Sequence, residues 1–431
     1  MDLTAVLLLS LIFVVLLFVG VPVAFCIGLS TAAAMLVSVA PVPSMTTVAQ
    51  RMATGLDSFA LLAIPFFILA GQLMNQGGIA RRLVDFAKSV VGMLPGGLAY
   101  VNVVAAMLFG AVSGSAAAAA SAVGGFMGPQ MRKEGYDKNY SAAVNITSAT
   151  TGLLIPPSNI LIVYALAGGG LSIGALFLAG YVPGILVGLS LMLVAGVWAY
   201  RKGYPVGERS SLGKVLRRFL QALPSLMMLV VVIGGIVVGI FTATEAAAVA
   251  VLYALVLAFL YREIGMADLP AILLQTVRTT AIVMLLVGTS IAMSWILSFE
   301  HIPEQISTSL IALTESKVVV LLIINAILLV IGTFMDMTPA VLIFTPIFLP
   351  IVVELGVDPV HFGIIMVLNL CVGLCTPPVG GVLFIGAAVG ETTIAKLVRP
   401  LMPLFLAMLA ALLLVTYVPE LSLWLPQLFG Y

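Results

Sequence analysis

Gly152-Leu-Leu-Ile-Pro156-Pro157 and Gly373-Leu-Cys-Thr-Pro377-Pro378 are two versions of one short stretch, and they decide the fold of this chain. They end two segments, 129–157 and 350–378, that align position by position without a gap. Most of the matched positions are Gly, Pro or Asp, and Gly and Pro fix the shape of the backbone rather than fill a core. We therefore predict two related halves, each with a helix that is broken and held open at its paired prolines.

The composition identifies the solvent of the protein. Of the 431 residues, 62% are hydrophobic and 8% are charged, and the mean hydropathy is +1.25. Soluble domains carry about 25% charged residues, so the chain is predicted to be a polytopic membrane protein with a nearly all-helical backbone. The net charge of +1 argues against nucleic-acid binding. Cys26, Cys371 and Cys375 lie in apolar runs without a nearby His or carboxylate, so no transition-metal site is expected.

Two apolar runs are too long for one membrane span, because about 20 apolar residues cross a bilayer. They lie at about 96–131 and 318–353, and each is interrupted by small and polar residues. We predict a re-entrant helical hairpin in each run, followed by the broken helices at about 139–170 and 360–388. Ordinary spans are expected at about 3–20, 21–40, 58–76, 172–200, 221–241, 243–262, 276–298 and 400–418, with amphipathic helices at 79–92 and 301–314.

The basic residues predict the topology. The loop at 201–218 carries six Lys or Arg against one acid, which places it in the cytoplasm. With re-entrant hairpins, 16 of the 18 basic residues share that side, and only Arg51 and Lys317 lie outside. Both termini then lie outside, and the halves start on opposite sides of the membrane. The expected fold is therefore all-α with two inverted-topology repeats, 1–200 and 221–431, joined by a basic linker at 201–220. Inverted repeats with broken helices are typical of secondary transporters.

The hairpin tips offer ligands for a hard cation. Backbone carbonyls with nearby hydroxyls or a carboxylate suit such an ion, whereas helix N-termini suit an anion. We predict no cofactor, but two sites for sodium as the coupling ion, made of Ser113, Ser115, Asn145 and Gly152 in the first half and of Gly332, Asp336, Thr338, Gly373 and Thr376 in the second. An anionic substrate is expected to contact Ser113, Gly114, Thr338 and Ser158.

Few other ionisable residues are candidates for chemistry. Asp336 is the carboxylate deep in an apolar run, where such residues are usually functional. It could instead cap a hairpin helix, and if it titrates, a proton would contribute to coupling. Glu245 follows Thr242 and Thr244 and is predicted to stabilise a helix N-terminus. His301 and His361 are expected to be solvated at the acidic outer surface.

Four motifs resemble the large membrane subunit of tripartite ATP-independent periplasmic (TRAP) transporters, the DctM-like family. They are Gly110-Ala-Val-Ser-Gly-Ser115, Gly152-Leu-Leu-Ile-Pro-Pro-Ser158, Gly239-Ile-Phe-Thr-Ala-Thr-Glu-Ala-Ala-Ala248 and Gly373-Leu-Cys-Thr-Pro-Pro-Val-Gly380. The resemblance covers essentially the whole chain. It implies a sodium-coupled importer of small organic acids (the C4-dicarboxylate, sialic acid or sugar-acid class) in the bacterial inner membrane, with an elevator-type scaffold and a moving transport domain. It also implies two partners, a separate small four-helix membrane subunit and a periplasmic solute-binding protein, and it makes the outer side the periplasm.

Other functions are weighed against this one. A stand-alone sodium/carboxylate symporter would share the inverted hairpins and need no binding protein. An intramembrane protease using Ser113 or Ser115 needs a base within hydrogen-bond reach, and both histidines are expected at the outer surface. A passive channel would need a filter motif, which the sequence does not offer. We therefore expect a transporter and not an enzyme.

Overall fold

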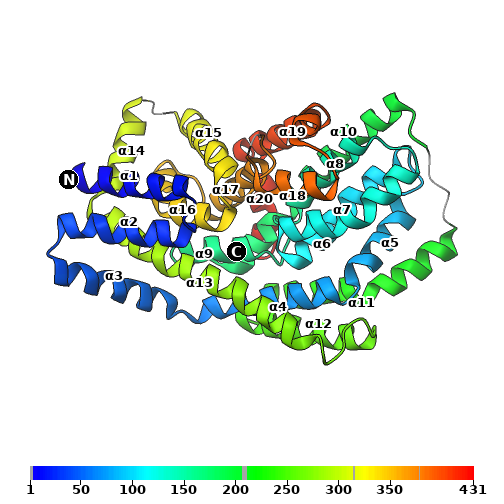
Figure 1. Cartoon of the computed structure of the whole chain (residues 1–431), viewed down its shortest axis with the longest axis horizontal. Coiled ribbons are helices and arrows are strands. Elements are labelled where there is room, and N and C mark those ends of the chain that lie inside the picture. The colour runs from blue at the N-terminus through cyan, green and yellow to red at the C-terminus, as the bar shows by residue number, and fades with distance from the viewer. Residues whose placement is uncertain (1–2, 206–210, 314–315, 378) are drawn as a thin grey trace.

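The computed structural model describes residues 3–205, 211–313, 316–377 and 379–431, and the regular elements in these ranges are helices (Figure 1). Eight helical stretches among them are long and apolar enough to cross a membrane. A helix satisfies its own backbone hydrogen bonds, which lipid cannot do. The all-helical architecture expected from the composition is thus confirmed.

One set of packed helices, here called the peripheral group, follows the left and lower edges of Figure 1. Its strongest packing joins α4 to α12 and α1 to α2, and α2 also packs on α13. The group consists of α1 (Leu3–Val19), α2 (Val23–Ser38), α3 (Pro41–Leu56), the 3-10 turn η1 (Phe59–Leu62), α4 (Ala63–Gln76), α11 (Leu212–Val237), α12 (Ala243–Leu260) and α13 (Leu269–Phe299).

The second set, the hairpin group, fills the upper and right parts of Figure 1. Within it α6 and α7 pack on α8, α15 packs on α17, and α10 packs on α19 and α20. The group consists of α6 (Gly97–Ser113), α7 (Ala116–Lys133), α8 (Lys138–Thr151), α9 (Asn159–Ala167), α10 (Ile173–Lys202), α15 (Lys317–Phe334), α16 (Met337–Glu354), α17 (Pro359–Gly373), α18 (Gly381–Val389), α19 (Ile394–Tyr417) and α20 (Glu420–Leu428).

The interrupted runs form helix pairs where the sequence predicts hairpins. α6 and α7 are separated by Gly114 and Ser115, and α15 and α16 by Met335 and Asp336. Gly114 has a φ of +61°, which is a conformation that glycine adopts readily. The starts of α7, α8 and α10 align with the starts of α16, α17 and α19 in the same register that aligns Gly152 with Gly373. The two halves of the hairpin group therefore share one pattern of helix starts.

Two helices connect the groups. α5 (Ile79–Val91) packs on α6 of the hairpin group and on α11 of the peripheral group, and α14 (Ile302–Leu313) contacts α16 and α13. Asp85 of α5 forms an ion pair with Arg218 of α11 at 3.0 Å. Arg82 lies over the ring of Tyr261, 3.6 Å from its centroid, and also pairs with Glu263 at 3.8 Å. The basic end of α5 is therefore attached to the peripheral group.

The peripheral helices differ from expectation in three places. The polar stretch from Pro41, to which the sequence assigned no element, forms α3, in part because its prolines occupy the first turn, which tolerates proline. α11 begins at Leu212, within the expected linker, because the Ser211 hydroxyl accepts a hydrogen bond from the Lys214 amide. α13 begins at Leu269, about two turns before the expected start of its apolar run.

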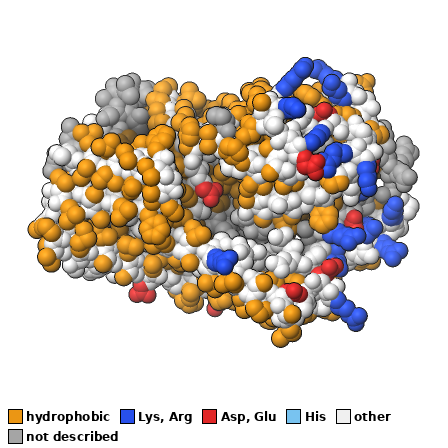
Figure 2. Space-filling view, viewed as in Figure 1, with side chains coloured by type: hydrophobic (Ala, Val, Ile, Leu, Met, Phe, Trp, Pro, Cys, Tyr) orange, Lys and Arg blue, Asp and Glu red, His pale blue; other side chains and the backbone are white. Residues whose placement is uncertain are grey.

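Basic side chains gather at the right end of the molecule in Figure 2, over the region where Figure 1 places α5, α7, α10 and the start of α11. Hydrophobic side chains cover most of the remaining visible face. One charged end beside a broad apolar surface is the pattern expected of a protein whose basic loops share one side of a membrane.

Candidate functional site

Both hairpin tips border one cavity of about 620 Å³. The hairpin group lines it with Ser113 to Ala118 from the first hairpin and with Thr333 to Thr338 from the second. The peripheral group closes it with residues of α4 and α13. Two tips that belong to different halves of the sequence are thus brought to one space, where a ligand could touch both.

The first tip is held by its own serines. The Ser115 hydroxyl accepts a hydrogen bond from the Ala118 amide at 3.2 Å and caps the N-terminus of α7. The Ser113 hydroxyl lies 3.4 Å from the Ser115 carbonyl oxygen, to which it donates. Ser113, Gly114 and Ser115, which are all predicted site residues, line the cavity.

The second tip repeats this arrangement with a carboxylate. Asp336 is the N-cap residue of α16, and its Oδ1 accepts a hydrogen bond from the Met337 amide at 2.9 Å. Its side chain is exposed to the cavity, as is part of Thr338. Capping and access to the cavity are therefore compatible in one residue, and the two roles weighed for Asp336 do not exclude each other.

Each hairpin crosses its broken helix at a pair of glycines. A Cβ placed on Gly110 would come 2.8 Å from the Cα of Gly152, and a Cβ on Gly373 would come 2.7 Å from the Cα of Gly332. Real Cβ atoms essentially never approach a backbone atom so closely. The predicted residues Gly152, Gly332 and Gly373 thus bring backbones together directly beneath the tips.

Four helix N-termini face the cavity. The first residues of α7, α9, α16 and α18 all line it. Ser115 and Asp336 cap two of these helices, whereas the N-cap residues of α9 and α18, Ser158 and Gly380, make no side-chain hydrogen bond to the helix. Uncapped amides at a helix N-terminus, together with the helix dipole, attract an anion.

The cavity carries very little formal charge. Among its lining residues, all of which the structure describes, Asp336 is the one carboxylate, and none is Lys, Arg or His. The remaining polar lining residues are hydroxyl or carboxamide side chains: Gln72, Asn75, Ser113, Ser115, Asn159, Gln275, Thr279, Thr333 and Thr338. An anion in this space would meet dipoles and hydroxyls, with one negative side chain beside it.

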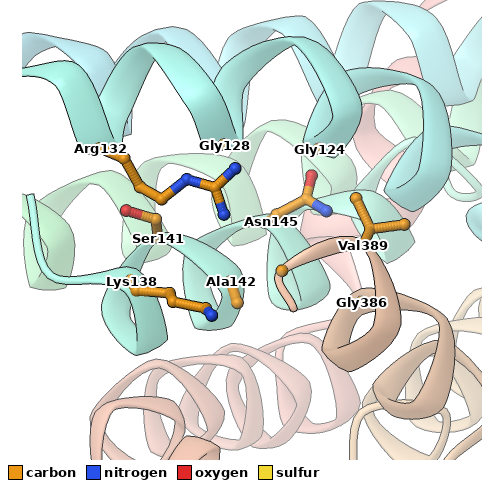
Figure 3. A pocket seen from close by; sticks show the side chains of 10 residues that line it. Gly124, Gly128, Arg132, Lys138, Ser141, Ala142, Asn145, Gly386 and Val389 are labelled. Atoms are coloured by element: carbon orange, nitrogen blue, oxygen red, sulfur yellow. The ribbon is translucent and has the colours of Figure 1, made fainter. Parts of the chain in front are cut away.

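Three predicted polar residues lie outside this lining. Asn145, which is 3% exposed, borders a separate small pocket between α7, α8 and α18, where Figure 3 shows it near Arg132 and Lys138. Ser158 is buried and donates its hydroxyl to the Leu153 carbonyl oxygen. Thr376 donates to the Val372 carbonyl oxygen at 2.9 Å.

The prolines occupy the two breaks. Pro156 and Pro157 lie between α8 and α9, and the peptide bond between them is cis. Pro377 lies between α17 and α18. Pro378 falls outside the described residues. Proline has no amide hydrogen to donate, which fits the geometric role expected for these positions.

Several lining residues were not predicted from the sequence. Asn159 begins α9 directly after the first break, and its buried Oδ1 has no hydrogen-bond partner among the described residues. Its position just after Pro156-Pro157-Ser158 was the available signal. Gln72 and Asn75 of α4, with Gln275 and Thr279 of α13, are single polar residues in or next to apolar runs, and only their meeting in space identifies them.

Of the other ionisable residues, Glu245 and His301 lie as the sequence predicted and His361 does not. Glu245 forms the predicted cap, because Thr242 and Glu245 form a reciprocal capping box at the start of α12. His301 is exposed and pairs with Glu304 at 2.7 Å. His361 is 2% exposed, so the expectation of a solvated side chain is wrong. The helix α20 covers it, and its Nδ1 lies 2.6 Å from the Ser422 hydroxyl.

Comparison with known proteins places these features in a family. The sequence profile described as "Tripartite ATP-independent periplasmic transporter, DctM component" matches residues 10–421. The chain is 56% identical to the uncharacterized protein YgiK of Salmonella typhimurium, over 97% of this chain and 96% of that protein. It is 39% identical to the C4-dicarboxylate TRAP transporter large permease protein DctM of Rhodobacter capsulatus, over 97% and 98%. It is 38% identical to the sialic acid large permease protein SiaM of Vibrio cholerae, over 96% and 97%.

A solved structure supports the fold. The YdaH transporter of Alcanivorax borkumensis, whose structure is described as having an unusual topology, superposes with a TM-score of 0.63 over 89% of this chain and 88% of that one, at 15% identity. The relatives in sequence are transporter permease subunits and not enzymes. This chain therefore belongs to the tripartite ATP-independent periplasmic transporter family, as its DctM component, the large membrane permease subunit.

Proposed function

We propose that this permease imports a small organic acid by coupling it to sodium, with the acid bound in the cavity between the two hairpin tips. The observation that carries the proposal is the meeting of four helix N-termini around a space that contains one carboxylate and no basic side chain among its lining residues. Relatives named for C4-dicarboxylate and sialic acid supply the substrate class.

The carboxylate of the acid is assigned to the N-termini of the two uncapped helices, α9 and α18. Amides at the starts of α9 and α18 have no side-chain cap, so a carboxylate there would gain hydrogen bonds and the helix dipoles. Asp336 would repel such an acid unless a cation lay between them. This requirement supports coupling, because the acid binds well only after the cation has bound.

The cation sites are assigned to the tips. In the first, Ser113 and Ser115 would supply oxygen atoms together with free carbonyls near the Gly110–Gly152 crossing. In the second, Asp336 and Thr338 would do so near the Gly332–Gly373 crossing. Sodium prefers oxygen ligands, as other hard cations do. Asn145 lies beside Arg132 and Lys138 and is left out of this assignment.

The transport movement is assigned to the hairpin group. The recurrence of helix starts at a constant offset supports two repeats, 1–200 and 221–431, and the charge pattern supports their inversion. In an elevator-type cycle the hairpin group would carry the cavity across the bilayer, and the peripheral group would remain in place as a scaffold. The amphipathic helices α5 and α14 would serve as the flexible connections.

The partners and the membrane follow from the family. Permeases of this type act with a small membrane subunit and a periplasmic solute-binding protein in the bacterial inner membrane. The basic linker would then face the cytoplasm and both termini the periplasm. A stand-alone sodium/carboxylate symporter is the second candidate, since its cavity would have the same chemistry.

Reconstitution separates these candidates. The permease and its small membrane subunit are placed in proteoliposomes, and uptake of radiolabelled succinate, L-malate, D-gluconate and N-acetylneuraminate is measured with and without the binding protein. Uptake of one acid that requires the binding protein supports the tripartite importer. Equal uptake without it supports the stand-alone symporter, and no uptake of any acid under either condition contradicts the proposed substrate class.

A further inference from the structure

The wall of the cavity that the peripheral helices α4 and α13 form is apolar at one end and polar at the other. α4 contributes Ile64, Ile68, Gly71, Gln72 and Asn75, a spacing of three and four residues that describes one helix face. The apolar residues come first on this face, and the two carboxamides lie in the last two turns of the helix. Gly71 packs against the backbone of Ser113 at the first tip. Gln72 and Asn75 therefore lie between the level of this tip and the C-terminal end of α4.

α13 shows the same gradient in the opposite chain direction. It contributes Gln275, Thr279, Ile282, Val283 and Leu286 at the same spacing. Here the polar residues come first, within three turns of the N-terminus, and the apolar residues follow. The polar part of the cavity face therefore lies near the C-terminus of α4 and near the N-terminus of α13, and the apolar part lies farther from these ends.

The polar ends of the two helices are neighbours. Arg82, shortly after the end of α4, pairs with Glu263, shortly before the start of α13. The end of α4 leads into the basic helix α5, so both ends lie on the side assigned above to the cytoplasm. We call Gln72, Asn75 and Gln275 the inner collar.

The collar residues are available to a ligand. Gln72 is half-buried, and Asn75 and Gln275 are exposed. Thr279, by contrast, donates its hydroxyl to the Gln275 carbonyl oxygen at 3.1 Å. Polar side chains in membrane helices that face a cavity usually mark a pathway, and the three carboxamides can each donate and accept a hydrogen bond.

We propose that the inner collar is a release-side subsite that binds hydroxyl groups of the departing acid. The cavity that is open to the cytoplasm then binds hydroxylated acids more tightly than acids without hydroxyls. This inference rests on the proposed function, because it takes the cavity as the route of an organic acid. A hydroxyl donates and accepts and so matches a carboxamide fully, whereas a carboxylate only accepts. The collar is also neutral, and it therefore holds an anion less firmly than an arginine would.

The location of the collar makes its effect one-sided. It belongs to the peripheral group, and the hairpin group would bring the acid beside it only when the cavity opens to the cytoplasm. Changes in the collar should therefore alter the response to acid inside the vesicle more strongly than the response to external acid.

The test uses the complete transporter in right-side-out vesicles with its binding protein. Initial uptake of the transported acid is measured after the vesicles are loaded with increasing L-malate or succinate, which differ by one hydroxyl. For the wild type, internal malate should slow uptake at a concentration about three- to ten-fold lower than succinate, the range expected for one neutral hydrogen bond. Gln72→Leu and Gln275→Leu should remove this difference.

Gln76→Leu is the matched control, because Gln76 is an exposed carboxamide of α4 that does not line the cavity. It should keep the wild-type preference. Gln275→Glu provides a variant of nearly equal size and should weaken the response to both internal acids.

Three results would overturn the collar while leaving the proposed function intact. The first is an equal effect of internal malate and succinate on the wild type, and the second is no slowing of uptake by either internal acid. The third is a shift in the half-saturating external concentration of the Leu variants that is as large as their shift in the response to internal acid. Failure of the wild type to take up any of the acids would instead overturn the proposed function, and the collar with it.

Discussion

Gly110 and Gly152 touch through their backbones where the first hairpin crosses the first broken helix, and a Cβ on Gly110 would lie 2.8 Å from the Cα of Gly152. Gly332 and Gly373 make the equivalent contact in the second half. Such contacts place the ends of helices, with their unpaired carbonyls and amides, within reach of one ligand. The two crossings therefore connect the sequence repeat to the site.

The Gly110→Ala substitution tests this crossing. The added methyl group meets backbone, which cannot move aside as a side chain can, so the protein should lose about 1–3 kcal/mol of stability and most of its uptake activity. Thermal unfolding of the purified protein and uptake by proteoliposomes measure the two effects.

Gly125→Ala is the control for this substitution. Gly125 lies in the middle of α7, and none of the described atoms lies within 4 Å of the place that a Cβ would take. Alanine favours a helix over glycine by about 0.5–1 kcal/mol, so this variant should be neutral or stabilising. Equal losses in both variants would show that the crossing has no special role.

The Asp336→Asn substitution separates charge from capping. Asparagine caps a helix about as well as aspartate, so the hydrogen bond to the Met337 amide and the thermal stability should be kept. The lost charge should raise the half-activating sodium concentration at least ~10-fold, since hydrogen bonds and contacts to charged groups are worth about 1.5–3 kcal/mol. An unchanged sodium activation curve would remove Asp336 from the cation site.

The Arg82→Lys substitution tests the attachment of α5. Lysine keeps the charge near Glu263 but loses the flat contact with the Tyr261 ring, where the Arg82 guanidinium carbon lies 3.6 Å from the centroid. We expect a loss of about 0.5–1 kcal/mol of stability. Arg81→Lys, at the exposed neighbouring residue, should have no effect. Thermal unfolding of the two variants should therefore differ, and equal midpoints would contradict the assignment.

The Tyr136→Phe substitution tests the packing of the loop between α7 and α8 against Tyr204, just after the end of α10. Tyr136 stacks on Tyr204 with 4.3 Å between ring centroids, and burial raises the pKa of Tyr136 to about 12. Above pH 10 the unfolded chain would ionise this residue while the folded protein would not, so stability should fall between pH 10 and 12. Tyr136→Phe should reduce that fall.

Tyr200→Phe serves as its control, because the Tyr200 ring is largely exposed. Thermal unfolding at several pH values from 8 to 11.5 measures both variants. A fall of the same size in the wild type and in Tyr136→Phe would contradict the predicted contribution of Tyr136.

Glycine and proline made the hairpin group predictable. They act locally, so the tips at Gly114 and Asp336 and the breaks after Gly152 and Gly373 could be placed to within a few residues. The composition of the apolar runs likewise indicated helices that span a membrane. Each of these signals is carried by a short segment of chain.

The remaining features depend on contacts that no single segment encodes. His361 is buried because α20 packs over it, and nothing near His361 in the sequence indicates that Ser422 will lie beside it. Gln72 and Gln275 are ordinary polar residues until α4 and α13 bring them to one cavity. Asn145 shows the same dependence, since it borders a pocket with residues of α7 and α18 rather than the cavity at the tips, a placement that its own segment does not encode.

The most direct test of the account is uptake driven by sodium alone. Proteoliposomes containing the permease, its small membrane subunit and the binding protein are given an inward sodium gradient, with no ATP and with the membrane potential clamped at zero. The account predicts that the labelled acid accumulates above its external concentration and that accumulation stops when sodium is equal on both sides. Accumulation that is indifferent to the sodium gradient would contradict it.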